Sequence, residues 1–142
     1  MEKGKSIIDH YKKYKLLIKA MIYWRLKFPD FPNPHIRTNA FMINRKLMLR
    51  IKYKRLKNKF MAYIMESGRN SITKQVLSMG FDVVVIDRWG GNYNIEQWPD
   101  SKTFWIDDQQ NLLISDNQTR LYEKAEEEEK SKLAYLAWGR NG

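Results

Sequence analysis

Hydrophobic residues recur at alternating steps of four and three between Ser6 and Phe28, except that Arg25 takes one expected position with Trp24 beside it, and neither glycine nor proline interrupts this run. The spacing places them along one face of an α-helix, and serine is favoured at a helix N-terminus. Residues 28–35, FPDFPNPH, then contain three prolines within six positions. Proline lacks an amide donor and disfavours helix in the residue before it. We therefore predict a helix of about six turns followed by a change of direction.

The next segment, RKLMLRIKYKRLKNKF at residues 45–60, shows two competing periods. From Leu47 to Tyr53 every second residue is hydrophobic, as in a β-strand. A longer pattern, with steps of four and three from Leu49 to Tyr63, indicates a helix. Most residues here are good helix formers, and neither glycine nor proline interrupts the longer pattern. We predict a second helix that begins near Thr38, with a strand as the alternative for residues 41–54.

Two sets of hydrophobic residues would lie on opposite sides of this second helix. The main stripe should pack on the first helix and form an antiparallel hairpin joined by the proline turn. It consists of Leu49, Tyr53, Leu56 and Phe60. The second set consists of Ile43, Leu47 and Ile51. Because one neighbouring helix cannot cover both sides, the second set should either pack inside the chain or form a two-fold homodimer.

The second half of the chain predicts a short helix, four strands and a final helix. Asn70 or Ser71 can cap the helix SITKQVLSM, and Gly80 can end it with a positive φ. Four hydrophobic and aromatic segments separated by turn residues predict an antiparallel meander. They are FDVVVID, YNIEQW, TFWID and NLLIS. Residues 118–138 predict a C-terminal helix that stops at Gly139. Five residues of this helix should face inward: Leu121, Ala125, Leu133, Leu136 and Ala137.

These elements predict an α+β fold: a basic N-terminal helical hairpin, a short helix, a four-stranded antiparallel meander and a C-terminal helix. With 142 residues, 43% of them hydrophobic, the chain has the length and composition of one folded domain, residues 1–142. Composition and charge both change near Asn70, which separates a basic helical half, 1–69, from the sheet and last helix, 70–142.

Cysteine content and hydrophobic run length bear on localisation. The chain has no cysteine, which excludes disulfides and is typical of a reducing compartment. No uninterrupted hydrophobic run exceeds six residues, as at 60–65 and 133–138, whereas roughly 20 are needed to cross a bilayer. The N-terminal segment also lacks the apolar core of a signal peptide. We expect a cytoplasmic protein without a membrane partner.

Charge divides the chain more sharply than composition does. Residues 1–74 contain 19 Lys and Arg against 4 Asp and Glu, a net charge of +15. Residues 75–142 contain 7 against 12, a net charge of −5, and the two values add to the +10 of the whole chain. A positive field confined to one half is typical of a surface for a polyanion, most often nucleic acid, although lysine-rich helices also serve solubility.

No pattern in the sequence predicts catalysis or metal binding. The two histidines, His10 and His35, lie in a helix and in a proline turn, and no cysteine can support a zinc site. Residues 107–111 match the first ligand positions of a calcium loop, but a leucine follows where glycine is required. Asp100 and Asp108 lack the neighbouring lysine of a nuclease site. We expect a protein with no enzymatic activity, cofactor or metal.

Two functions fit these observations. The first is a non-enzymatic nucleic-acid-binding protein, for DNA or RNA, that contacts phosphates through a basic helical surface. Its candidate residues are Arg45, Lys46, Arg50, Lys52, Lys54, Arg55, Lys57 and Lys59. The second is a small accessory or inhibitory protein, of the phage or mobile-element type, whose basic face binds an acidic partner protein and whose exposed aromatics act as anchors. The aromatic contact candidates are Trp89, Tyr93, Trp98 and Trp105.

Overall fold

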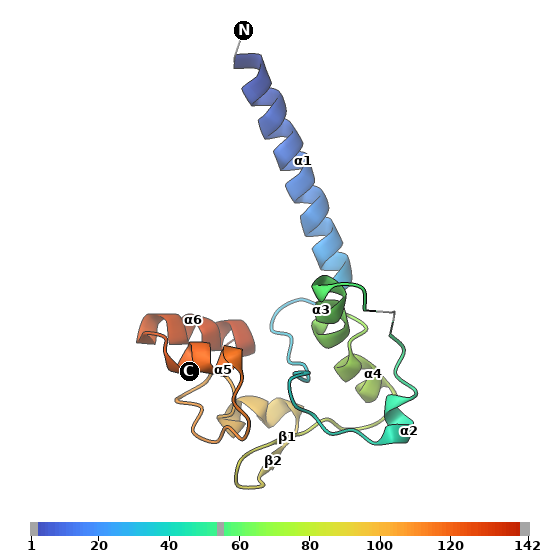
Figure 1. Cartoon of the computed structure of the whole chain (residues 1–142), viewed down its shortest axis with the longest axis vertical. Helices are drawn as coiled ribbons and strands as arrows, with labels where there is room; N and C mark the ends of the chain where they lie inside the picture. Colours follow the sequence, from blue (N-terminus) through green and yellow to red (C-terminus); the bar gives the residue numbers. More distant parts are fainter. Residues whose placement is uncertain (1–2, 54–55, 140–142) are drawn as a thin grey trace.

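The computed structural model describes residues 3–53 and 56–139, with side chains from residue 12 onward (Figure 1). Its fold is α+β, as the sequence predicts, with one long helix, several short helices and one small sheet. In chain order the elements are α1 (Lys3–Lys27), α2 (Arg45–Met48), α3 (Lys59–Ser67), α4 (Ile72–Ser78), β1 (Val85–Ile86), β2 (Asn92–Tyr93), the 3₁₀ helix η1 (Ile95–Ser101), α5 (Asn117–Glu123) and α6 (Glu127–Trp138). None of these helices is both long and apolar enough to cross a lipid bilayer.

The first predicted helix is confirmed, because α1 ends directly before Phe28 and the prolines. The antiparallel hairpin is wrong: α1 projects away from the other elements, and α3 lies only at its base (Figure 1). The contact is aromatic, with the Trp24 ring 4.2 Å from that of Phe28, and Phe28 edge-on to Phe60 at 6.1 Å. Of the predicted stripe, Phe60 packs on α1, whereas Leu49 and Tyr53 are exposed.

The prediction of one long second helix is also wrong, and no strand replaces it in the described residues. α2 is a single turn capped by Asn44, and Asn58 caps α3. The described residues between these helices, 49–53 and 56–58, lie outside any helix or strand, and we call them the irregular segment. The buried side chain of Gln75 explains part of this path. Its Oε1 accepts from the amide of Lys52 at 2.7 Å, and its Nε2 donates to the carbonyl of Lys52 at 2.9 Å. Lys52 therefore pairs both backbone groups with a side chain instead of with a helix or sheet.

A hydrophobic core forms where α4 packs on Ile51 of the irregular segment. Ile51, Ile72 and Val76 are buried together, and Leu47 and Ile43 pack against them. The second hydrophobic set is thus covered within the chain, which removes the surface on which the predicted homodimer depended. The helix α4 itself follows the sequence signals, since Ser71 caps it and Gly80 follows with φ +80°.

The sheet is much smaller than predicted. β1 and β2 form one antiparallel pair, with Val85 opposite Tyr93 and Ile86 opposite Asn92, so the four-stranded meander is wrong. The glycine turn between them is as expected, with Gly90 at φ +84°. Asp87 closes this turn, because its Oδ1 accepts from the amides of Trp89 and Gly91, each at 2.8 Å.

Of the other three predicted strands, only Tyr93 of YNIEQW lies in a strand, and the remaining residues are helix or loop. YNIEQW becomes β2 and η1 because Asn94 and Gln97 form a reciprocal capping box and start the 3₁₀ helix. TFWID cannot stay extended, since Trp105 has φ +46°. Phe104 and Trp105 were expected on opposite faces of a strand, but their rings stack at 4.6 Å. NLLIS is likewise outside any strand.

The predicted C-terminal helix is interrupted and forms α5 and α6. Asp116 caps α5 through a capping box with Thr119, and Gly139 ends α6 with φ +72°. The inward-facing set is wrong in part, because Leu121 and Leu136 are exposed while Ala125, Leu133 and Ala137 are half-buried. Tyr122 and Ala134 are the buried residues of this pair of helices.

Arg37 joins the two halves of the molecule. It forms an ion pair with Asp116, and its guanidinium lies 3.9 Å from the ring centroid of Phe104. Burial lowers the pKa of Arg37, and the charges of Asp116 and Glu66 oppose that shift in part. Glu66 also accepts from the amide of Thr38 at 2.7 Å, so the segment after the prolines is tied to α3 and to the cap of α5.

Candidate nucleic-acid interface

An open groove of about 540 Å³ lies where the end of α1, the irregular segment before α3, and α3 itself meet. Three aromatic and three basic residues line it, together with aliphatic residues of α1, the irregular segment and α3. The aromatic residues are Tyr23, Tyr53 and Phe60, and the basic residues are Lys27, Lys52 and Arg69. We call this feature the basic groove. It combines apolar surface with positive charge in one concave site.

Backbone contacts fix the basic residues of this groove. The backbone amide and carbonyl of Lys52 both form hydrogen bonds with the side chain of Gln75, as described above. The amide of Arg69 donates to the carbonyl of Lys27 at 2.8 Å, and its Nε donates to the carbonyl of Arg25 at 3.1 Å. Gly68 permits this close approach, because a Cβ there would lie 2.5 Å from the carbonyl oxygen of Ile64. Arg69 thus caps the C-terminus of α1, where cations are favoured.

The aromatic rings of the basic groove remain open to a ligand. Tyr23 stacks on Phe60 with 5.9 Å between ring centroids, and Lys27 Nζ lies 5.5 Å from the Tyr23 ring. Tyr23 is still 49% exposed and Tyr53 is 59% exposed. Large exposed rings beside cations form a surface that favours flat or anionic ligands.

Five further candidate cations lie near residues of the groove in the sequence. Arg45, Lys46, Arg50, Lys57 and Lys59 are all exposed. None of them forms an ion pair with another described residue, and the only contact of their charged groups is Lys59 Nζ above the Tyr63 ring at 5.7 Å. Lys54 and Arg55 lie outside the described residues. The candidate surface is mostly irregular and not helical, since only Arg45, Lys46 and Lys59 belong to helices.

The aromatic candidates of the second half do not form one platform. Trp98 is 2% exposed and belongs to the core, so its prediction as a contact residue is wrong. Trp105 stacks on Phe104 and donates its indole N–H to the carbonyl of Gln118 at 3.0 Å. The hydroxyl of Tyr93 donates to Asp87 at 3.0 Å, which raises the pKa of Tyr93. Trp89 alone of the four is strongly exposed, at 77%.

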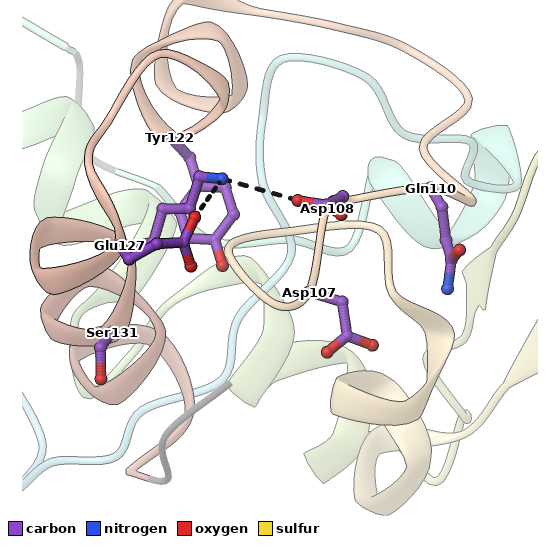
Figure 2. Close-up of a pocket in the computed structure, with 7 residues that line it drawn as sticks. Asp107, Asp108, Gln110, Tyr122, Glu127 and Ser131 are labelled. Atoms are coloured by element: carbon purple, nitrogen blue, oxygen red, sulfur yellow. Dashed lines mark hydrogen bonds and ion pairs between the residues drawn. The ribbon is translucent and has the colours of Figure 1, made fainter.

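A second hollow, of about 370 Å³, lies beside α5 and α6 and is acidic (Figure 2). Its carboxylates are neutralised within the chain. Lys130 Nζ lies 3.0 Å from Glu127 and 3.5 Å from Asp108, and Lys102 pairs with Asp107 at 3.0 Å. The hydrogen bond to Glu127 is the main reason that the pKa of Lys130 is raised. Among the described residues, no group of three or more His, Cys, Asp or Glu could hold a metal ion.

Sequence reasoning missed half of the basic groove. Tyr23, Lys27 and Arg69 were not singled out, and Tyr53 was treated as a packing residue. Lys27 stands next to the proline turn, and Arg69 follows the glycine that ends α3. Basic residues at such helix ends were an available signal, because cations are favoured near the C-terminus of a helix.

No protein-family model, no curated protein and no solved structure matches the chain. The function is therefore argued from the surface chemistry of this molecule.

Proposed function

We propose that the protein binds nucleic acid without catalysing a reaction, and that the basic groove with its surrounding cations is the binding surface. One observation carries the proposal: Lys27, Lys52 and Arg69 line one groove and form no ion pair with another described residue. Lys57 and Lys59 flank Asn58 at its edge, and Arg45, Lys46, Arg50 and Lys74 are further exposed cations of the neighbouring chain.

Electrostatics supports a polyanionic ligand. Lys57 and Lys59 lie at the N-terminus of α3, where the partial positive charge of the helix disfavours cations. A phosphate placed there would relieve both the repulsion between the lysines and their repulsion by the helix. Because α2 is a single turn, the cations at residues 45–50 are not arranged along a long helix that could enter the major groove of duplex DNA. We therefore expect contacts to phosphates and little sequence preference.

The salt dependence of binding tests this proposal. If about five phosphates are contacted, log affinity should fall with log salt with a slope of about −4 to −5 for duplex DNA and about −3.5 for a single strand. Replacing Arg50, Lys52, Lys57 and Lys59 with Ala should weaken binding to every sequence alike and flatten the slope by about 3. Fluorescence anisotropy at several salt concentrations measures both quantities.

A charge-matched variant controls for the loss of net charge. Four basic residues of the second half are replaced in it: Arg88, Arg120, Lys124 and Lys132. It lowers the net charge as much as the first variant, but it should leave the slope almost unchanged because these residues lie outside the basic groove. Equal effects of the two variants, or no binding at low salt, would contradict the proposal.

One observation favours a second candidate function, recognition of an acidic partner protein. Along the side of α1 that carries Tyr14, Leu17 and Met21, large hydrophobic residues are exposed and Arg25 is the only cation among residues 12–27 on that side. A partner could cover this face while its acidic groups meet the neighbouring lysines. Capture of a partner from a nuclease-treated lysate, lost when Leu17 and Met21 are replaced with Ser, would favour this candidate.

A further inference from the structure

We infer that the ligand of the basic groove is single-stranded nucleic acid, with unpaired bases stacked on Tyr23 and Tyr53 and phosphates placed against Lys27, Lys52 and Arg69. This inference rests on the proposed function. It adds that the ligand is single-stranded and names the residues that contact its bases and its phosphates.

The composition of the groove carries the first step. A surface that binds only phosphates needs cations, yet most residues that line this groove are apolar or aromatic. Tyr53 is 59% exposed and forms no ring contact with another described residue. Sites for single strands combine a positive groove with exposed aromatic rings, because every base has a flat face that stacks without regard to sequence.

Size and preorganisation carry the second step. The volume of about 540 Å³ lies within the range of sites that enclose small organic ligands. The Tyr23 ring is held by Phe60 beneath it, with 27° between the ring planes. The backbone that carries Tyr53 follows directly after Lys52, which Gln75 fixes on both sides. The Tyr23 ring and the backbone that leads to Tyr53 are therefore positioned before a ligand arrives, which lowers the entropy lost on binding.

The direction of α1 carries the third step. Lys19 and Lys12 precede Tyr23 by four and eleven residues, and Lys27 follows it by four. Residues at these spacings lie on the same side of a helix. The side of α1 that faces the groove therefore continues as a row of exposed lysines along the projecting helix (Figure 1). A strand leaving the groove would meet a lysine about every two turns, which suits an extended polyanion better than a compact acidic protein.

Duplex nucleic acid fits this surface less well. Its bases are paired and stacked inside the helix, so they cannot reach Tyr23 or Tyr53, and only its phosphates would be contacted. The basic groove thus distinguishes single-stranded from duplex nucleic acid by whether bases are available for stacking, and not by charge. This difference can be measured directly.

An abasic strand provides the test, because it carries the same phosphates but no bases. Fluorescence anisotropy compares a labelled oligothymidylate with an abasic strand of equal length and with a duplex of equal length. We expect the oligothymidylate to bind about 5- to 150-fold more tightly than the abasic strand for each base that stacks. Tyr53→Ala should remove about one such factor, leave the salt slope unchanged and leave binding of the abasic strand unchanged.

Two control variants test whether the effect of Tyr53→Ala comes from the loss of base stacking. They distinguish it from a change in folding and from the loss of any exposed tyrosine. Tyr53→Phe keeps the ring and should keep the affinity for oligothymidylate. Tyr14→Ala removes an equally exposed tyrosine of α1, more than two turns from Tyr23, and should have no effect. Melting followed by circular dichroism confirms that each variant folds like the parent protein.

Each outcome decides between the two claims. Equal affinities for the oligothymidylate and the abasic strand would overturn this inference and leave the proposed function standing. Binding of neither strand at low salt would overturn both. Displacement of oligothymidylate by polyglutamate at equal charge concentration would also overturn the inference, in favour of an acidic protein ligand. Tighter binding of the base-containing strand, lost in Tyr53→Ala and kept in Tyr53→Phe, supports it.

Discussion

The helices α1 and α4 show how poorly helix length predicts burial. α1 has 25 residues, and from residue 12 to Leu26 every side chain is exposed. α4 has seven residues, yet Ile72 and Val76 are buried in the core and Thr73 and Gln75 are buried as hydrogen-bonding groups. The short helix holds the fold together, whereas the long helix presents charge and apolar surface to solvent. This difference favours a structural role for α4 and a binding role for α1.

Ile72→Ala should give the largest effect on stability. Ile72 is 1% exposed, and its truncation removes apolar contacts and leaves a cavity at the centre of the core. Substitutions of this kind cost about 2 to 5 kcal/mol. Urea unfolding followed by circular dichroism measures the change. A loss below about 1 kcal/mol would show that the core around α4 contributes less than its burial indicates.

Gln75→Leu should cost about 1 to 3 kcal/mol and should also weaken oligonucleotide binding. The substitution leaves the amide and carbonyl of Lys52 and the carbonyl of Asn70 without their partner. Lys52 and Tyr53 would then lose the position that Gln75 gives them. Ser78→Ala, which removes one hydrogen bond near the end of α4, is the matched control and should leave binding unchanged. Unaltered affinity in Gln75→Leu would contradict the preorganised groove.

Asp87 should make stability depend on pH in the acid range. Burial alone would raise the pKa of Asp87, but the amides of Trp89 and Gly91 and the hydroxyl of Tyr93 stabilise the carboxylate, and the net pKa is lowered. Its stabilising contribution is complete above the ordinary pKa of 3.8 and is lost as the pH falls below that value through the lowered pKa. Unfolding measured between about pH 2 and 5 should therefore change less steeply in Asp87→Asn than in the parent protein.

Leu17→Ala on α1 should give the smallest effect. Leu17 is exposed, and surface substitutions away from special features usually change stability by no more than about 0.5 kcal/mol. The same urea titration measures it beside Ile72→Ala, so the two helices are compared directly. A loss as large as that of Ile72→Ala would mean that another molecule covers this face of α1 in solution, which a dependence on protein concentration would reveal.

Local end signals in the sequence predict element boundaries well. Ser71 and Gly80 bound α4 as expected, Gly90 forms the hairpin turn, and Gly139 ends α6. These signals succeed because the interactions that fix a helix end or a turn are made within a few neighbouring residues. They are either a side-chain cap or a residue that accepts a positive φ. The end of α1 before Pro29 belongs to the same class.

Longer elements were predicted poorly because distant or irregular contacts decide them. The long second helix fails because Gln75, 23 residues away, pairs with Lys52. The strand TFWID fails because Trp105, Asp107 and Gln109 adopt positive φ without being glycine, which leaves no signal in the sequence. Gln109 stabilises that loop by accepting from the amide of Trp105 and donating to the carbonyl of Thr119. Likewise, the charge map indicated the basic half, but only folding brings Lys27, Lys52 and Arg69 together.

The way in which α1 is attached determines how far its lysines can reach. α1 meets the rest of the described chain through its last two turns, where Gly68 and Arg69 approach the carbonyl of Lys27. A helix of 25 residues is about 37 Å long, so it acts as a lever arm about this junction. A rotation of about 10° moves the far end by about 6 Å. The same rotation would move Lys19 by about 2 Å and Lys12 by about 4 Å, so the row of charges could follow strands that leave the groove in slightly different directions.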